Sequence, residues 1–186
     1  MTIGFALCGS YCTYDRVFPV IEALRKENKV IPILSEAAYA TDSRFGTAEH
    51  WKTRLEEICG CPPLHLISQV EPIGPKGLLD ILVIAPCTGN TLAKLAHSIA
   101  DGPVTMAAKS HLRNGRPVLV AVSTNDGLAG AGENIGRLLA RKHYYFVPFG
   151  QDDAVKKPTS LVADFSKIPS AIEAAMEGKQ IQPLLL

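Results

Sequence analysis

Short apolar runs separated by segments of helical periodicity constrain this sequence more strongly than any other feature. Residues 81–85 and 118–122 are apolar at every position, a pattern typical of strands that are buried on both faces of a parallel sheet. Between such runs, apolar residues recur at i, i+3, i+4 and i+7, which places them on one face of a helix. The predicted strands are residues 3–7, 30–34, 81–85, 118–122 and 144–147. The predicted helices lie within residues 17–28, 51–60, 92–99, 104–112, 133–141 and 168–176.

Three segments fit neither pattern. Residues 35–46 are small and polar, so we expect a loop. Residues 64–67 are expected to form a short extended piece, and a connection rich in proline and glycine then leads to residue 81. Residues 150–159 are polar and are expected to be mobile. The strand before them, residues 144–147, is therefore expected to be the last one. Because residues 81–85 form the most apolar run, we place that strand at the centre of the sheet.

The order of these elements predicts an α/β fold with a doubly wound, mostly parallel sheet and helices on both of its faces. We expect one domain over residues 1–186, in which residues 150–186 are a C-terminal extension that ends in a helix. Right-handed crossovers bring all the strand-to-helix turns to one edge of such a sheet, and ligands bind at that edge. Function is therefore expected in the turns after Leu7, Leu34, Ala85 and Val122.

Composition argues against several classes of partner. The chain has 19 basic and 18 acidic side chains for a formal charge of +1, whereas nucleic-acid binders and membrane-surface proteins normally carry a basic excess. Its five cysteines are an odd number without a regular framework, which indicates a reducing, cytoplasmic compartment. The first residues lack the features of a signal peptide, and no apolar run is long enough to span a bilayer.

The first turn has the residues of an anion site. Gly9 permits a close approach of the backbone, and Ser10 stands before a helix whose free N–H groups favour a phosphate. A turn that only caps the helix remains an alternative. The second and third glycines of the dinucleotide fingerprint are missing, and no P-loop sequence follows.

The other turns are also polar. Ser35 follows the second strand, and Thr88, Asn90 and Thr91 follow the central one. Asn90 could be no more than a helix N-cap, but three neighbouring polar side chains favour a pocket for a phosphate and a flat polar ring. Residues 123–132 carry three glycines and form either a flexible turn or a mobile loop that faces a substrate.

Other common sites are not supported. The five histidines and the Cys59-Gly-Cys61 pair do not have the spacing of a metal site, so no metal is expected. No Gly-x-Ser-x-Gly element indicates a hydrolase triad. Cys87 lies before a helix, where a thiol pKa can fall, but a small buried cysteine is the more common case.

Three parts of the sequence resemble a flavoprotein family that includes phosphopantothenoylcysteine decarboxylase and lantibiotic cysteine decarboxylases. They are residues 8–10, residues 85–96 with their Pro-x-x-x-Asn-Thr element, and Asn125. The resemblance spans about residues 3–148 and implies a flavodoxin-like fold, FMN at the strand ends between subunits, and trimers as building blocks. The cofactor-binding residues that it implies are Gly9, Ser10, Ser35, Thr88, Asn90 and Thr91.

Two departures separate this chain from the decarboxylases of that family. Those enzymes have a histidine shortly before the central strand, where this chain reads residues 70–77 without one. Their Pro-x-Met-Asn-x-x-Met-Trp substrate element is replaced by residues 122–129, in which only Asn125 is kept. Asn125 is therefore predicted to contact a substrate, while cysteine decarboxylation is disfavoured.

The whole chain is more similar to the B subunits of dipicolinate synthases from spore-forming bacteria. The similar stretches are residues 4–13, 84–91, 123–128 and 157–164. This resemblance implies a partner A subunit that binds NAD(P), and oxidation of a dihydrodipicolinate-type precursor to pyridine-2,6-dicarboxylate in the cytoplasm of the mother cell during sporulation. Lys94, Lys109 and Arg113 are possible partners for the two substrate carboxylates, although solvated surface side chains are the more common case.

Three hypotheses follow from these patterns. The first is a flavin-binding oxidoreductase subunit that acts with the A subunit. The second is an independent FMN-dependent decarboxylase, and the third is a flavin-type fold that only stabilises the A subunit. No catalytic residue is assigned, because a pocket for the FMN phosphate can also hold a substrate carboxylate.

Overall fold

A computed structural model describes residues 1–186, the whole chain, and its centre is a mostly parallel sheet. Neighbouring strands follow the order β2-β1-β3-β4-β7-β6, and β5, outside this order, also pairs with β4. Strands β1 to β5 run parallel, whereas β7 is antiparallel to both β4 and β6. The strands are β1 (Thr2–Leu7), β2 (Lys29–Leu34), β3 (Ile81–Cys87), β4 (Val118–Thr124), β5 (Tyr144–Phe146), β6 (Phe149–Asp153) and β7 (Lys157–Ala163).

The central place of β3 is confirmed. It lies between β1 and β4, and every one of its seven residues is buried. Since β1 and β3 pair in parallel register from Ile3 opposite Ile81, their carboxyl ends reach the same edge of the sheet. A strand covered on both faces needs an uninterrupted apolar sequence, and residues 81–85 supply one.

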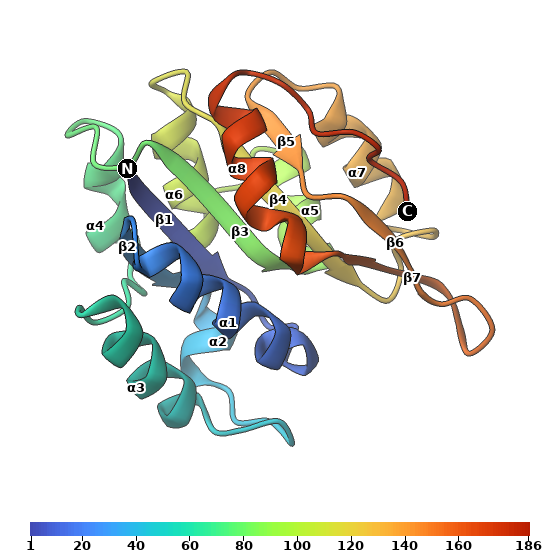
Figure 1. Cartoon of the computed structure of the whole chain (residues 1–186), viewed down its shortest axis with the longest axis horizontal. Coiled ribbons are helices and arrows are strands. Elements are labelled where there is room, and N and C mark those ends of the chain that lie inside the picture. Colours follow the sequence, from blue (N-terminus) through green and yellow to red (C-terminus); the bar gives the residue numbers. More distant parts are fainter.

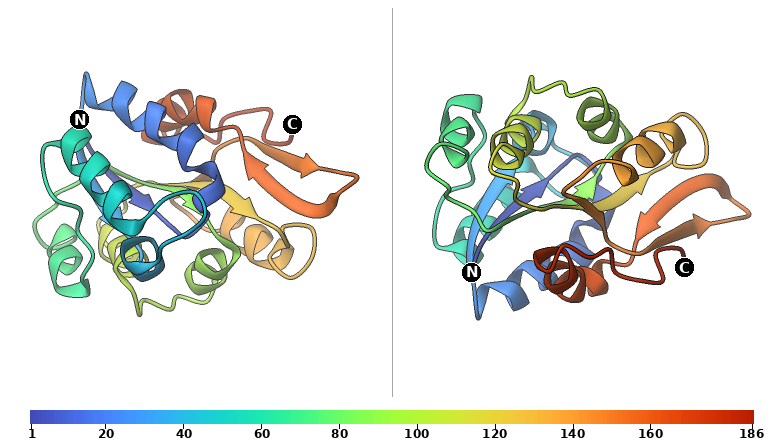
Figure 2. Two further views of the ribbon diagram at one scale, coloured as in Figure 1. Left: turned by 90° about the horizontal axis from the view of Figure 1, so that it is seen from below. Right: turned by 90° about the horizontal axis from the view of Figure 1, so that it is seen from above.

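Helices cover both faces of the sheet, as predicted (Figure 1). Helices α1 and α8 pack on one face, and α5, α6 and α7 lie on the other, as the two views in Figure 2 show. The helix over residues 168–176 has the bounds that its periodicity predicts. The α-helices are α1 (Tyr14–Arg25), α2 (Glu36–Ala40), α3 (Ala48–Cys59), α4 (Ile67–Val70), α5 (Gly89–Ala96), α6 (Pro103–Leu112), α7 (Gly132–Leu139) and α8 (Ile168–Met176). Single 3-10 turns, η1 (Tyr11–Thr13), η2 (Glu71–Ile73) and η3 (Phe165–Lys167), complete the fold.

Two predictions between the second and third strands were wrong. Residues 35–46 are not all loop, because Ser35 begins α2 by accepting a hydrogen bond from the Ala38 N–H at 3.2 Å. Of the predicted extended piece 64–67, only Leu64 pairs with the sheet, opposite Ile33, and α4 begins at residue 67. Both helices have five residues or fewer, so they carry no periodic signal.

A third prediction failed at the end of the chain. Residues 144–147 do not contain the last strand, and the polar segment 150–159 lies mostly in the hairpin of β6 and β7. The hairpin projects from the body of the molecule (Figure 1). Its base joins the sheet, because Ser123 pairs with Val162 and Thr124 with Leu161. Strands exposed to solvent need few apolar residues, which is why their composition resembles that of a loop.

Aromatic residues join α1 and α3 to the core. Trp51 packs against Tyr14 and Phe18 with ring centroids 5.1 and 5.0 Å apart, and all three side chains are buried. No helix of the structure is both long and apolar enough to cross a bilayer. No group of three or more His, Cys, Asp or Glu side chains is arranged to hold a metal ion.

Candidate functional site

Two adjoining cavities lie where the parallel strands end. The first, which we call the Ser35 cavity, has a volume of about 330 Å³ and lies between the turns after β1, β2 and β3 and the start of α6. The second, the Arg16 cavity, has a volume of about 450 Å³ and lies between the turns after β1 and β4, the start of α1 and the β6–β7 hairpin. Both volumes are within the range usual for small-molecule sites.

The structure brings the predicted site residues to these two cavities. Five of the six predicted cofactor residues line the Ser35 cavity, whereas Ser10 and Asn125 line the Arg16 cavity. Gly9 and Thr88 line both, so the cavities meet at this pair of residues. The five residues of the Ser35 cavity are Gly9, Ser35, Thr88, Asn90 and Thr91.

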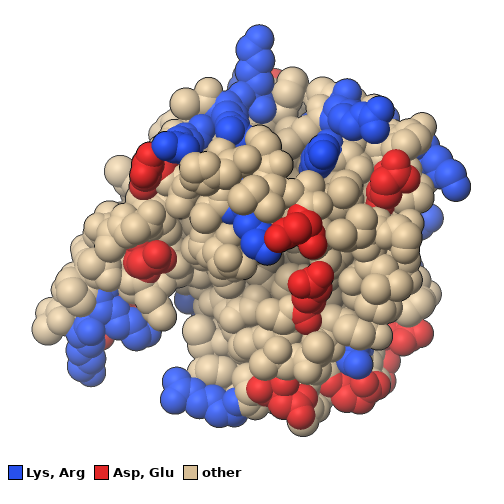
Figure 3. Space-filling view, turned by 180° about the vertical axis from the view of Figure 1, so that it is seen from behind, with Lys and Arg blue, Asp and Glu red and all other residues tan.

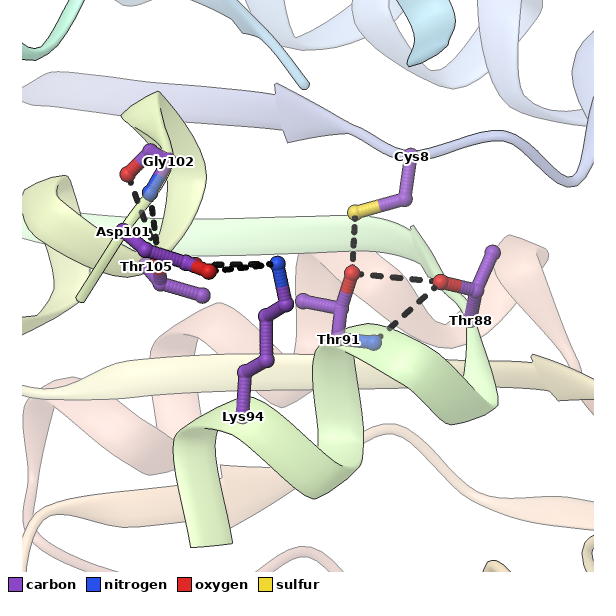
Figure 4. A network of polar contacts seen from close by, with 7 residues as sticks. All are labelled: Cys8, Thr88, Thr91, Lys94, Asp101, Gly102 and Thr105. Carbon is purple, nitrogen blue, oxygen red and sulfur yellow. Dashed lines mark hydrogen bonds and ion pairs between the residues drawn. The ribbon is translucent and has the colours of Figure 1, made fainter. Parts of the chain in front are cut away.

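A chain of hydrogen bonds joins the start of α5 to the end of β1 (Figure 4). The Thr88 hydroxyl accepts from the Thr91 N–H and lies 3.1 Å from the Thr91 hydroxyl. Thr91 in turn donates to the Cys8 Sγ at 3.3 Å. Thr88, rather than Asn90, is therefore the N-cap of α5, and the hydroxyl of the buried Thr91 is engaged within the protein.

The amide of Asn90 is left free by this arrangement. Asn90 is exposed in the first turn of α5, and its side chain makes no hydrogen bond within the chain, although it lines the cavity. An amide has both donors and an acceptor, so Asn90 can bind a ring with mixed polar edges. The N-terminus of α5 adds free N–H groups on the same side.

A second polar group lies one turn further along α5. Lys94 binds the carboxylate of Asp101, with distances of 2.9 and 3.0 Å to its two oxygens (Figure 4). This contact lowers the pKa of Asp101 and keeps the carboxylate charged. Behind it, the Gly102 N–H donates to the Thr105 hydroxyl at 3.2 Å. Glu36 forms no ion pair and is thus the unneutralised carboxylate of the Ser35 cavity.

The Arg16 cavity is built across the sheet. The hydroxyl oxygens of Ser10 and Ser123 lie 2.7 Å apart and connect the ends of β1 and β4. Asn125 follows β4 and has an exposed side chain. Its carbonyl oxygen accepts from the Thr159 hydroxyl at 2.7 Å, which fastens the loop to the hairpin. The loop of residues 123–132, which was predicted to be flexible or mobile, is thus held at its start.

Two cations in this cavity were missed by the sequence reasoning. Arg16, on α1, has no acidic partner, and its guanidinium lies 5.2 Å from the centre of the Phe165 ring. Lys157 comes from the hairpin and pairs with Asp152, which raises the pKa of Lys157. The position of Arg16 shortly after the glycine-serine turn is the only local signal that would have suggested it.

The thiols at the ends of β1 and β3 are not activated. Burial raises the pKa of the Cys8 thiol to about 11 and that of Cys87 well above its ordinary value, so both are inert. His65 stacks on Tyr39 with centroids 3.7 Å apart and does not line either cavity. Residues 70–77, which lack the decarboxylase histidine, lie in α4, η2 and the turn that follows.

Comparison with known proteins agrees with this architecture. Residues 1–131 match the Flavoprotein family. The chain is 46% identical over 185 residues to the B subunit of dipicolinate synthase from Bacillus subtilis, covering 99% of this chain and 92% of the relative. The crystal structure of the dipicolinate synthase B subunit from Bacillus halodurans is also 46% identical, with a TM-score of 0.91 over 100% of this chain and 95% of that one.

A more distant structure shares the fold alone. The FMN-dependent cysteine decarboxylase SpaF superposes with a TM-score of 0.71 over 95% of both chains at 22% identity. The family match covers well over half of the chain, and the two Bacillus relatives cover nearly all of it. The chain therefore belongs to the Flavoprotein family and, within it, to the family of dipicolinate synthase B subunits.

Proposed function

We propose that this chain is the B subunit of a two-component dipicolinate synthase, an oxidoreductase. The observation that carries the proposal is the 46% identity over 99% of the chain with a relative of that name. Such a subunit implies a second component, the A subunit, and we assign NAD(P) to it because this chain has no dinucleotide fingerprint. Together they would oxidise a dihydrodipicolinate-type precursor to pyridine-2,6-dicarboxylate in the mother-cell cytoplasm of a sporulating cell.

The residues of the Ser35 cavity fit FMN. Ser35, Thr88 and Asn90 offer hydroxyls and a free amide to the polar edge of a flat ring, and the turn at Gly9 and Ser10 offers a helix N-terminus to a phosphate. When bound, FMN supplies a ring that accepts and returns reducing equivalents. The residues of the Ser35 cavity would hold this ring at the sheet edge.

The neighbouring Arg16 cavity fits the dicarboxylate. The planar guanidinium of Arg16 can bind a carboxylate with two parallel hydrogen bonds, and Lys157 adds a second positive charge. Asp152 offsets one of the two charges, so the cavity has a net charge of about +1 from these three side chains. Asn125 completes the substrate side as a hydrogen-bonding group.

Aromatisation of a dihydropyridine also requires loss of a proton from the ring. Glu36 is the strongest candidate to accept it, because it lines the Ser35 cavity without a cationic partner. Asp101 and Asp152 are less suited, since Lys94 and Lys157 hold them as ion pairs. For Glu36 to act in this role, the substrate must meet the flavin where the two cavities join, beside Gly9 and Thr88.

The assembly is part of the proposal. By its family resemblance, the chain forms homo-oligomers based on trimers, in which a neighbouring copy covers the flavin. This arrangement explains why the Ser35 cavity of one copy is open to solvent at the exposed side chains of Glu36 and Asn90. Association with the A subunit would then bring NAD(P) to the same edge of the sheet.

A flavin retention experiment tests the proposal first. The purified chain is mixed with FMN, passed through a gel-filtration column and examined for a flavin absorbance band that elutes with the protein. We expect retention, and we expect oxidation of the dihydropyridine with NAD(P) only after the A subunit is added. Activity of the A subunit alone that this chain raises but does not create would instead support the scaffold hypothesis. Release of carbon dioxide from a cysteinyl substrate without any partner would instead support the decarboxylase hypothesis.

A further inference from the structure

A third cavity lies apart from the site already described. Its volume is about 480 Å³, and it lies between the ends of α5 and α6 and the turn that follows α7. Thr105 is the only residue that it shares with the Ser35 cavity. We call it the Arg113 cavity and define it by Ile99, Lys109, Arg113, Arg141, Lys142 and Tyr144.

The Arg113 cavity is strongly positive in a chain that is nearly neutral. Lys109, Arg113, Arg141 and Lys142 line it, and no acidic residue does. None of the four forms an ion pair within the chain. Figure 3 shows Lys and Arg side chains gathered along the upper part of this face of the molecule.

Helix termini account for only part of this charge. α5, α6 and α7 all end near the cavity, and a helix C-terminus is equivalent to roughly −0.5 of a charge. Three such ends amount to about −1.5, against four cationic side chains. Compensation of the helix dipoles therefore leaves a surplus of more than two positive charges.

One cation is fixed in place. The guanidinium of Arg141 donates to the carbonyl oxygens of Leu95 and Ala96 at 3.1 and 2.6 Å and to the Ser98 hydroxyl at 3.3 Å. A guanidinium has five N–H donors, so two remain. Because its side chain is already ordered, binding an anion there costs less conformational entropy.

A buried phenol at the same place lacks a partner. Tyr144 is 8% exposed and its hydroxyl makes no hydrogen bond within the chain. Trp51 Nε1 is the only fully enclosed polar side-chain atom without a partner, so the Tyr144 hydroxyl reaches open space. Burial raises the pKa of Tyr144 to about 12, which keeps the phenol protonated as a donor.

We propose that the Arg113 cavity binds a small aromatic carboxylate. Ile99, Leu95 and Leu112 offer apolar surface to a flat ring, and Tyr144 offers a donor to a carboxylate that the four cations attract. A carboxylate on an aromatic ring suits the site better than an inorganic phosphate, because much of the lining is apolar. The site is independent of the flavin and would take a ligand while FMN occupies the Ser35 cavity.

The test measures binding of benzoate and isophthalate by calorimetry at low salt, with neutral benzamide and inorganic phosphate as comparison ligands. We expect both carboxylates to bind, benzamide and phosphate to bind at least about tenfold more weakly, and affinity to fall with added salt. Lys109→Glu should weaken the affinity for benzoate by about tenfold or more, and Tyr144→Phe should weaken it by about threefold to tenfold. The control Lys167→Glu makes the same charge change at an exposed position away from the cavity and should leave the affinity unchanged.

Three results of the binding comparisons would overturn the proposal, and a fourth concerns the oligomeric state. They are equal affinity for benzoate and benzamide, displacement of benzoate by inorganic phosphate at the same concentration, or equal loss in Lys109→Glu and Lys167→Glu. A change of oligomeric state in Lys109→Glu without a change in benzoate affinity would also overturn it, because the cavity would then belong to an interface between copies. Asn90→Asp should abolish FMN retention and leave benzoate binding intact, so that a failure of one site is distinguished from a failure of the other.

Discussion

Ser10 and Ser123 are 113 positions apart in the chain, yet their hydroxyl oxygens lie 2.7 Å from each other. Ser10 follows β1 and Ser123 lies near the end of β4, while β3 runs between these two strands in the sheet. The pair therefore ties together two turns that line the Arg16 cavity. A single hydrogen bond can in this way determine the shape of the cavity.

Removal of either hydroxyl should lower stability and reveal this coupling. Ser10→Ala and Ser123→Ala are each expected to lower the free energy of unfolding by about 0.5–1.5 kcal/mol. The double variant should lose less stability than the sum of the two single losses, because the second change removes a hydroxyl that has already lost its partner. Urea unfolding measures the free energy of unfolding of the three variants. Ser68→Ala, at an exposed serine on α4, is the control, and additive losses would contradict the coupling.

Asn90→Asp should abolish FMN binding without harming the fold. The new carboxylate lies in the first turn of α5, where the helix dipole favours a negative charge by about 0.3–1 kcal/mol, so stability should hold or rise. The same change removes the amide donor that would face the ring and adds a negative charge to a cavity that would hold an anionic cofactor. Gel filtration with FMN tests the loss of cofactor binding, and a thermal melt tests the unchanged or raised stability. Asn134→Asp makes the same change in the first turn of α7, and the assignment fails if both variants retain FMN equally.

Arg16→Ala should weaken the binding of the dicarboxylate but leave FMN bound. Loss of a two-point contact with a carboxylate is expected to raise the dissociation constant about tenfold or more. Arg16→Lys should recover only part of this loss, because it keeps the charge and loses the planar fork. The readout is the change in the flavin absorbance spectrum on titration with pyridine-2,6-dicarboxylate, which reports only a ligand beside the flavin. Arg137→Ala on α7 is the control, and equal effects would refute a direct contact.

Acid should destabilise the protein through His111. This side chain is 1% exposed, its Nε2 lies 3.1 Å from the Pro117 carbonyl oxygen, and burial lowers its pKa from 6.5 to about 4. The unfolded chain binds a proton as the pH falls below about 6.5, whereas the folded protein resists it until about 4. The contribution of the neutral His111 to the free energy of unfolding is thus fully present above pH 6.5. Roughly 2–3 kcal/mol of it is lost as the pH falls from about 6.5 to about 4.

Urea unfolding at pH 7 and pH 4.5 checks the effect of His111. His111→Gln should be less stable at pH 7 and should lose much less stability on acidification than the unchanged protein. His50→Gln, at an exposed histidine, should keep the full pH dependence. An identical loss with acid in the unchanged protein and in His111→Gln would assign the effect to other groups.

Two glycines should respond in opposite directions to alanine. A Cβ at Gly127 would lie 2.6 Å from the Leu161 Cγ, so Gly127→Ala forces the loop away from β7 and should cost about 1–3 kcal/mol. A Cβ at Gly136 in α7 meets nothing within 4 Å, and Gly136→Ala should stabilise the helix by about 0.5–1 kcal/mol. Thermal melts compare the two variants directly. A stabilised Gly127→Ala would show that the loop does not pack on the hairpin.

Much of the fold was predictable because its main signals are local. The apolar run at residues 81–85 predicted the central strand, and the periodicity of residues 168–176 predicted α8 with its observed bounds. The polar turns at Ser35 and Thr88 were predicted to face a ligand because parallel strands share one edge for their carboxyl ends. These inferences need only spacing along the chain and the geometry of a parallel sheet.

The hairpin and the division of the site into two cavities were not predictable in this way. Residues 150–159 are polar, and nothing local shows that β7 turns back to pair with β4. The same turn brings Lys157 to the cavity that Arg16 lines, although the two residues come from opposite ends of the chain.

The sequence by itself determined the parallel part of the sheet, its central strand and the edge where the polar turns meet, since burial of apolar runs and helix periodicity act over a few residues. Only the tertiary structure decided that Asn90 is free while Thr91 is engaged, and that four cations and the Tyr144 hydroxyl share a separate cavity. The physical reason is that hydrogen bonds and fields act over a few ångströms in space, and distance along the chain does not determine which groups meet.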